Sequence, residues 1–235
     1  REQVVAAYEA AKEHGSSIVV ERYAPGDDHR ILIVGGKLVA AAKREPAQVI
    51  GDGVRTVGEL VAEVNKDPRR SDGHSTVLSH IKIDAIALGV LAEQGLTPDS
   101  VPAFDRKVLI RRNANLSTGG TAIDVTDKVH PDVVARAVEA ARMVGLDIAG
   151  VDLVCQDISR PIEPQGGAIV EVNAGPGLRM HIEPSEGQPR PVGEAIIDML
   201  FPPGDDGRVP VVAVTGVNGK TTTTRLIAHL IKGAG

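Results

Sequence analysis

The sequence has little of several residue types, and each scarcity excludes a class of protein. Its 235 residues include one cysteine, two tyrosines, two phenylalanines and no tryptophan. The single cysteine, Cys155, excludes an internal disulfide framework and is typical of a reducing cytoplasm, so we expect a cytoplasmic protein. Four scattered aromatic side chains cannot build a platform for stacking bases, and a net charge of −5 offers no broad basic surface for nucleic acid.

Long hydrophobic runs are also missing. No stretch approaches the ~18–20 apolar residues that a membrane-spanning helix requires, and the first residues do not form the pattern of a signal peptide. We therefore expect neither a membrane partner nor a nucleic-acid partner. The remaining composition, 42% hydrophobic and 24% charged, is that of an ordinary globular protein. Because aromatic residues are so few, Val, Ile, Leu and Ala must fill its core.

Apolar periodicity and turn residues predict an α+β or α/β chain with an antiparallel sheet and helices. The expected helices are 1–14, 56–66, 84–94, 131–144, 192–200 and 221–232. The expected strands are 17–24, 29–35, 37–44, 107–111, 122–125, 148–155, 168–173 and 209–214. The run PPGDDG at 202–207 is a linker, which predicts one domain over 1–204 and the start of a second over 205–235.

The last two strands expected in the first domain carry a group of possible metal ligands. Antiparallel pairing about a short turn would place Asp152 opposite Asn173 and Val154 opposite Glu171. Because side chains two apart share a face, Asp152, Glu171 and Asn173 would converge on one side. Two carboxylates and an amide oxygen suit Mg²⁺ held together with nucleotide phosphates. The alternative is a solvent-facing polar stripe, which strand alternation alone favours. The residues expected on the opposite face are Val151, Leu153, Val170 and Val172.

Two local sequence motifs favour the metal site over the solvent-facing stripe. The run GVDL at 150–153, followed by EVNAGPG at 171–177, resembles the metal-binding hairpin of ATP-grasp ligases. The run VVERYAPGDD at 19–28 resembles the hinge with which that family grips adenine and ribose. The resemblance implies an ATP-grasp fold over 1–204 without its N-terminal part, and binding of ATP and Mg²⁺. It assigns the adenine edge to Glu21, Tyr23 and Ala24, the ribose hydroxyls to Asp28, and the magnesium ions to Asp152, Glu171 and Asn173.

A glycine-rich loop follows a pair of arginines in RRNANLSTGGT at 111–121. Backbone N–H groups of such a loop can cradle an anion, and a guanidinium is a preferred fork for carboxylate or phosphate. A surface loop with a glycine hairpin is the alternative interpretation. By the ATP-grasp resemblance, Arg111 and Asn113 lie near the transferred phosphate and the acceptor, and Arg30 is a further candidate for phosphate contact. His74, in a polar loop, is interpreted as a solvated histidine rather than an acid or base.

A second nucleotide motif ends the chain. The run VVAVTGVNGKTT at 211–222 has the order of a buried strand, a glycine loop and a helix. Backbone N–H groups and a helix N-terminus favour phosphates, the lysine adds a point charge, and a threonine can bind Mg²⁺. The general P-loop has glycine at the position of Val214, so the motif resembles the Mur-ligase version more closely. The implied contacts are Gly216, Asn218, Gly219, Lys220, Thr221 and Thr222.

An ATP-grasp site followed by a Mur-type P-loop resembles the cyanophycin synthetase family. That resemblance implies aspartate, arginine and a cyanophycin primer as partners, with aspartate added at the ATP-grasp site and arginine at the Mur-like site through acyl phosphates. We expect a homo-oligomer at full length and no complete ligase cycle from residues 1–235 alone. The alternatives are another ATP-grasp peptide ligase, of the glutathione-synthetase or ribosomal-modification type, and a non-catalytic nucleotide-binding module.

Overall fold

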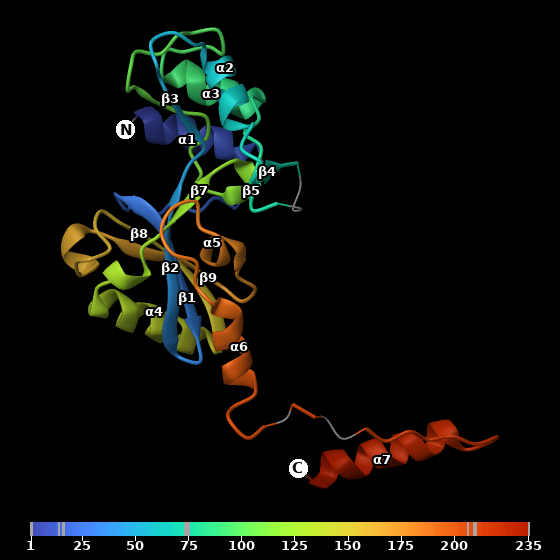
Figure 1. Cartoon of the computed structure of the whole chain (residues 1–235). Helices are drawn as coiled ribbons and strands as arrows, with labels where there is room; N and C mark the ends of the chain where they lie inside the picture. Colours follow the sequence, from blue (N-terminus) through green and yellow to red (C-terminus); the bar gives the residue numbers. More distant parts are fainter. Residues whose placement is uncertain are drawn as a thin grey trace. The chain divides into compact units, whose positions relative to one another are not determined.

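A computed structural model describes residues 2–13, 15, 17–72, 76–205, 207–208 and 211–234. The chain divides into two units, Arg1–Met199 and Leu200–Gly235, which are described separately (Figure 1). The domain boundary predicted after residue 204 falls shortly after the start of the second unit. Over the described ranges, no helix is long and apolar enough to cross a membrane.

A five-stranded antiparallel sheet forms the centre of the first unit. Its spatial order is β7–β2–β1–β8–β9. The strands are Thr121–Asp124 (β7), Lys37–Glu45 (β2), Asp27–Val34 (β1), Ile148–Cys155 (β8) and Ala168–Asn173 (β9). A tight turn at Gly35 and Gly36 joins β1 to β2. Both glycines have positive φ angles, 54° and 74°, which residues with a Cβ rarely adopt.

The two faces of this sheet have different cover. On one face, Ile31, Ile33 and Val151 pack with α4 (Pro131–Val144) in the largest apolar core of the unit. On the other face, Leu32 and Val34 pack with α6 (Val192–Leu200), and Ala42 packs with Met180 of α5 (Arg179–Ile182). Figure 1 shows α4 and α5 on opposite sides of the sheet. The face opposite α4 is also the one that carries charged residues near the start of β1.

A smaller lobe is built on a two-stranded sheet of β3 (Gln48–Ile50) and β6 (Lys107–Leu109). Helices α2 (Val57–Val64) and α3 (Ala85–Glu93) pack on it through Val57, Leu91 and Val108. Thr56 caps α2 in a capping box with Glu59, and Asp84 caps α3. The remaining elements of the first unit are α1 (Glu2–Lys12), a parallel pair of β4 (Arg70–Ser71) and β5 (Leu78–Ser79), and 3₁₀ turns at Leu116–Thr118, Thr126–Lys128 and Glu163–Gln165.

The second unit consists of a glycine loop and α7 (Lys220–Ala234). The strand expected over 209–214 is wrong for its described part, because residues 211–214 form no strand. Val211 and Val212 are 88% and 66% exposed, and among the described residues no strand pairs with them. A single β-loop-α segment cannot cover both faces of a parallel strand by itself.

Most other predicted elements are confirmed. Helix 131–144 and strands 148–155 and 168–173 have the predicted limits. The strand expected over 17–24 is wrong, since those residues form no strand. Strand β1 already has β2 on one side and β8 on the other, so a strand preceding it in the chain finds no free edge beside it.

Candidate functional site

Four charged side chains meet on the sheet face opposite α4. Asp28 lies opposite Arg44 in the β1–β2 ladder, and Arg30 lies opposite Asp152 in the β1–β8 ladder. Directly opposite residues of an antiparallel pair place their side chains on the same face. The register of the three strands therefore assembles Asp28, Arg30, Arg44 and Asp152, which we call the charged cluster.

Asp152 is the centre of the charged cluster. Arg30 donates from Nε to Oδ1 and from Nη2 to Oδ2, the latter at 3.0 Å. Arg44 donates from Nη2 to Oδ2 of Asp152 at 2.9 Å and from Nε to Oδ1 of Asp28 at 2.7 Å. The side chains of Arg44 and Asp152 are only 7% and 11% exposed. One buried guanidinium thus joins two carboxylates on different strands.

The β9 side of this face carries Glu171 and Asn173. Glu171 lies opposite Asp152, and Asn173 lies opposite Gly150, so the expectation that the three candidate ligands share a face is confirmed. The predicted register was wrong by two residues at Asp152, and by three at Val154, which lies opposite Ala168 rather than Glu171. The ladder shifts between Asp152 and Leu153, where Val170 is the extra residue of a β-bulge and is 63% exposed instead of facing the core.

These residues have the chemistry that a small divalent cation requires. Over the described ranges, no three His, Cys, Asp or Glu side chains form a metal cluster, so an amide oxygen would have to complete the set. Asn173 carries such an oxygen on the same face, and its amide nitrogen is buried without a hydrogen-bond partner among the described residues. The two ends of an amide are assigned from their partners, and a bound cation would select the oxygen. Asp152, Glu171 and Asn173 therefore fit Mg²⁺, provided that Asp152 shares its oxygens with the two arginines.

Two residues behind the charged cluster fix its surroundings. A Cβ on Gly150 would lie 2.6 Å from Cβ of Pro176 and 3.1 Å from Cδ of Arg30, so only glycine lets the turn after β9 approach the cluster. His181 of α5 is 2% exposed, and its Nε2 atom has no hydrogen-bond partner among the described residues. Burial, with a smaller effect of Arg30, lowers the pKa of His181 to about 4. The imidazole is therefore neutral near pH 7.

Arg111 lies in a separate hollow of about 290 Å³, among polar side chains that include His80, Lys82, Ser117 and Thr118. It donates from Nη1 and Nη2 to the two carboxylate oxygens of Asp84, at 2.8 and 2.6 Å. This pairing lowers the pKa of Asp84 below its usual range. A second hollow of about 300 Å³ shares Ser117 with the first and reaches the segment that follows Asn173.

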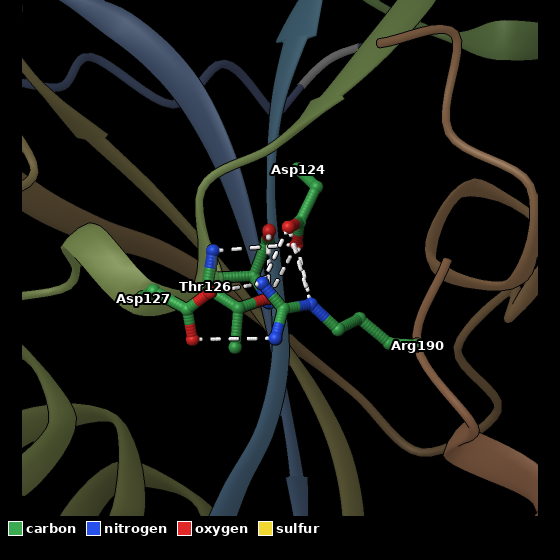
Figure 2. Close-up of polar contacts among 5 residues, drawn as sticks. Asp124, Thr126, Asp127 and Arg190 are labelled. Carbon is green, nitrogen blue, oxygen red and sulfur yellow. Dashed lines mark hydrogen bonds and ion pairs between the residues drawn. The ribbon is translucent and has the colours of Figure 1, made fainter. Parts of the chain in front are cut away.

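Arg190 fastens the segment after α5 to β7, as Figure 2 shows. Its Nη2 atom lies 2.6 Å from an oxygen of Asp124 and 2.6 Å from an oxygen of Asp127. Thr126 donates its hydroxyl to Asp124 at 2.5 Å, and Asp124 N–H donates to the carbonyl of Glu186 at 2.9 Å. The segment thus covers the outer edge of β7 and holds α5 over the face with the charged cluster.

Other predicted site residues lie apart from the cluster. Glu21 and Tyr23 are exposed and Ala24 is half-buried, in the unpaired segment that leads into β1. Asn113 is exposed at the Arg111 hollow, where its side-chain oxygen accepts from the hydroxyl of Thr118 at 3.0 Å. His74 lies outside the described residues.

The glycine loop of the second unit curls around its lysine. Lys220 Nζ donates to the carbonyls of Gly216 at 2.6 Å and Val217 at 3.2 Å. Gly216 and Gly219 have φ angles of 151° and 82°, which a side chain would disfavour. The other predicted phosphate contacts of this loop, Asn218, Thr221 and Thr222, are exposed.

Sequence reasoning missed Arg44, Asp84 and Arg190. Counting back from the Gly35–Gly36 turn places residue 43 opposite Asp28, and the β2 irregularity beside Ile33 moves the pairing to Arg44. Asp84 caps α3, and its second role as the partner of Arg111 leaves no local signal in the sequence. Arg190 lies 66 residues from Asp124, beyond the reach of spacing arguments.

No protein-family model matches the chain. Among solved structures, the crystal structure of a bifunctional glutathione synthetase from Pasteurella multocida is similar, with a TM-score of 0.66 and 41% identity over 77% of this chain and 24% of that one. That similarity confirms the ATP-grasp fold expected from the hairpin and hinge motifs, and the class defined by fold and sequence is the ATP-grasp ligases.

Curated sequences identify the family within that class. The chain is 54% identical over 234 residues to cyanophycin synthetase of Nostoc sp., covering 100% of this chain and 26% of that protein. It is 52% identical over 236 residues to cyanophycin synthetase of Synechocystis sp., covering 100% and 27%. It is 41% identical over 201 residues to the glutathione biosynthesis bifunctional protein GshAB of Clostridium perfringens, covering 86% and 26%. The chain belongs to the cyanophycin synthetase family and spans about a quarter of the length of these relatives.

Proposed function

We propose that the sheet face opposite α4 binds ATP and Mg²⁺ in a ligase that joins a carboxylate to an amine through an acyl phosphate. The observation that supports this most strongly is the β8–β9 hairpin, which presents Asp152, Glu171 and Asn173 beside two guanidinium groups. Mg²⁺, when bound there, would neutralise phosphate charge. Arg30 is the proposed phosphate contact. The remaining proposed ATP contacts are Glu21, Tyr23 and Ala24 for adenine and Asp28 for ribose.

Arg111 is the proposed contact for the acyl phosphate or the incoming carboxylate. Its guanidinium is buried and held at two points by Asp84, so little ordering remains to be done when an anion arrives. Asn113 and the hydroxyls of Ser117 and Thr118 line or border the same hollow. In such a reaction, catalysis rests on positioning and charge neutralisation rather than on a protein nucleophile.

We further propose two domains, an ATP-grasp part over 1–204 and the beginning of a Mur-ligase-like part over 205–235. The first would add aspartate to the backbone of a cyanophycin primer. The second would join arginine to the aspartate side chain. Its nucleotide contacts would be Gly216, Asn218, Gly219, Lys220, Thr221 and Thr222. The relatives of the cyanophycin synthetase family support this division of labour.

A peptide ligase of the glutathione type is the second candidate, because the GshAB relatives align with 83–86% of the chain. The two candidates differ in acceptor, so a substrate test separates them. A protein that contains this chain is supplied with ATP, Mg²⁺, primer and labelled aspartate or arginine. We expect both labels to enter the polymer. Formation of glutathione from its dipeptide precursor and glycine, without aspartate incorporation, would favour the second candidate.

A further inference from the structure

Arg44 contacts two carboxylates that the proposed function assigns to different parts of one ligand. Asp28 is the proposed partner of the ribose, and Asp152 is a proposed partner of the cation. The guanidinium reaches Asp28 from Nε at 2.7 Å and from Nη2 at 2.5 Å, and it reaches Asp152 from Nη2 at 2.9 Å. The inference below rests on the proposed function and concerns the order in which this site fills.

A cation that binds without nucleotide encounters a carboxylate, that of Asp152, whose oxygens already accept hydrogen bonds. Both oxygens of Asp152 accept hydrogen bonds from guanidinium groups, Oδ1 from Arg30 and Oδ2 from Arg30 and Arg44. These side chains are about nine-tenths buried, so solvent screens their charges poorly. A divalent cation must displace donors from Asp152 and approach two positive charges. Of the other two proposed ligands, only Glu171 adds a negative charge to offset the two arginines, and its side chain is exposed.

Nucleotide phosphates make cation binding favourable, since they bring negative charge to the same face as the two arginines. Arg44 is able to release Asp152 and still keep a carboxylate partner, because its Nε and Nη2 atoms both contact Asp28. Arg30 has Asp152 as its carboxylate partner and lies against Gly150, so it has less freedom to move away. Arg44 is therefore the donor that is able to give way.

We propose that Arg44 is a positioning residue that makes cation binding at Asp152 depend on bound nucleotide. With Arg44 on Asp152, the cation alone binds weakly. With phosphates present, the guanidinium remains on Asp28 and releases Oδ2 of Asp152 to the cation. Binding energies of two ligands that are linked in this way are coupled reciprocally, so the cation must strengthen nucleotide binding by the same factor.

The test uses the full-length protein that contains this chain, with Arg44→Gln and, as a matched control, Lys43→Gln. Lys43 is the preceding residue of β2, so it faces the other side of the sheet, where it pairs with Asp27 at 2.6 Å. Both variants remove one positive charge from the same strand, but only Arg44 touches Asp152. Affinity for Mn²⁺ alone is measured from free Mn²⁺ by electron paramagnetic resonance. Affinity for a non-hydrolysable ATP analogue, with and without Mn²⁺, is measured by calorimetry.

For the unsubstituted chain we expect weak Mn²⁺ binding alone and a coupling factor within the usual range of about 5- to 150-fold. Arg44→Gln should tighten Mn²⁺ binding alone and reduce the coupling at least about fivefold, two changes of opposite sign that general destabilisation cannot produce. Lys43→Gln should leave both values unchanged. Should Arg44→Gln fail to fold, Arg44→Lys replaces it, because an ammonium cannot span both carboxylates and the coupling should still fall.

The possible outcomes distinguish the role of Arg44 from the proposed function of the site. If the unsubstituted chain binds the analogue with coupling to Mn²⁺ and the Arg44 variants keep that coupling, the role of Arg44 is overturned and the proposed function stands. The same holds if Arg44→Gln weakens Mn²⁺ binding alone. If the unsubstituted full-length protein binds neither Mn²⁺ nor the analogue, the proposed function fails and the role of Arg44 fails with it.

Discussion

The two faces of the central sheet are made by the same strands but are stabilised in different ways. Strand β1 sends Ile31 and Ile33 to the core under α4, and it sends Asp28 and Arg30 to the charged cluster. The apolar face gains from every buried methylene, whichever neighbour covers it. The charged face gains only if each group finds its own partner, and a buried ion pair often stabilises no more than an apolar pair of the same volume.

That difference indicates that the charged face is retained for something other than stability. An apolar face tolerates different side chains of suitable volume, whereas Arg44 and Asp152 form their ion pair only in one strand register. The bulge at Val170 illustrates the point, because it keeps Ile169 against the apolar core while Glu171 faces the charged cluster. The following predictions test this division between the faces.

The largest effect is expected from Asp152→Asn. Removing the central carboxylate leaves Arg30 buried without its anion, and breaking a buried pair in this way costs about 3–5 kcal/mol of unfolding free energy. Urea unfolding followed by far-ultraviolet circular dichroism measures this, since the chain has no tryptophan. Asp27→Asn at the exposed pair with Lys43 is the control and should cost less than about 1 kcal/mol. Equal losses in both variants would contradict the contrast.

Acid should destabilise the charged face through the buried imidazole of His181. The pKa of His181 is about 4 in the folded chain, below the ordinary value of 6.5, because burial disfavours the charged imidazole. The unfolded chain takes up this proton first, so stability is lost as pH falls from 6.5 toward 4, by about 3 kcal/mol at pH 4. In His181→Gln that share of the pH dependence should disappear.

Unfolding curves of both proteins at pH 7 and pH 4 measure the difference. On the apolar face the Cys155 thiol stays protonated, because burial raises its pKa to about 11, but burial also lowers the pKa of His29 below its ordinary value. Both proteins therefore lose some stability in acid through His29, and the difference between them measures the share of His181. If His181→Gln shows the same loss of stability in acid as the unsubstituted chain, the buried neutral imidazole is not the cause.

A smaller effect is expected from Ile31→Val on the apolar face. Ile31 is fully buried, and removing one methylene from such a site costs about 0.5–1.5 kcal/mol. Its side chain faces away from the charged cluster, so affinity for the ATP analogue should not change. Calorimetry on the folded variant measures that affinity. A loss of binding that exceeds the loss of stability would show that the two faces are coupled.

The smallest effect on stability is expected from Glu171→Gln. Glu171 is exposed and opposite Asp152, so the unfolding free energy should change by no more than about 0.5 kcal/mol. Nucleotide affinity in the presence of Mg²⁺ should nevertheless fall about tenfold, because one carboxylate of the proposed cation site is lost. Calorimetry with and without Mg²⁺ checks this. An equal loss without Mg²⁺ would place Glu171 on the nucleotide rather than on the cation.

The sequence predicts those elements whose limits are set locally. Helix α4 begins at Pro131 and ends before Gly145, which has a φ of 76°, so both ends carry their own signals. Strands β8 and β9 alternate clearly enough to be found with their limits. The unpaired segment before β1 was mistaken for a strand because β-rich composition does not reveal that both edges of the next strand are already taken.

For the candidate site, the sequence predicts which residues share a face but not which of them touch. Asp152, Glu171 and Asn173 were grouped correctly by alternation, although the register was wrong by two residues on their side of the bulge and by three on the other. The contact between Arg44 and Asp152 depends on three strands being in register at once, and residues 108 positions apart carry no shared local pattern. The grouping by alternation survives here because the error at Asp152 is an even number of residues, whereas the prediction of a particular ion pair does not survive it.

Asp84 illustrates how one residue restricts its own replacement. Its Oδ1 atom accepts from the backbone N–H groups of Ile86 and Ala87 at the start of α3, while both its oxygens accept from Arg111. Asparagine would keep the helix cap but lose the anion, and glutamate would keep the anion but fit the cap poorly. Serine or threonine would serve the helix alone. Among the twenty amino acids only aspartate meets both demands, so this position has almost no mutational freedom even though its side chain is half exposed.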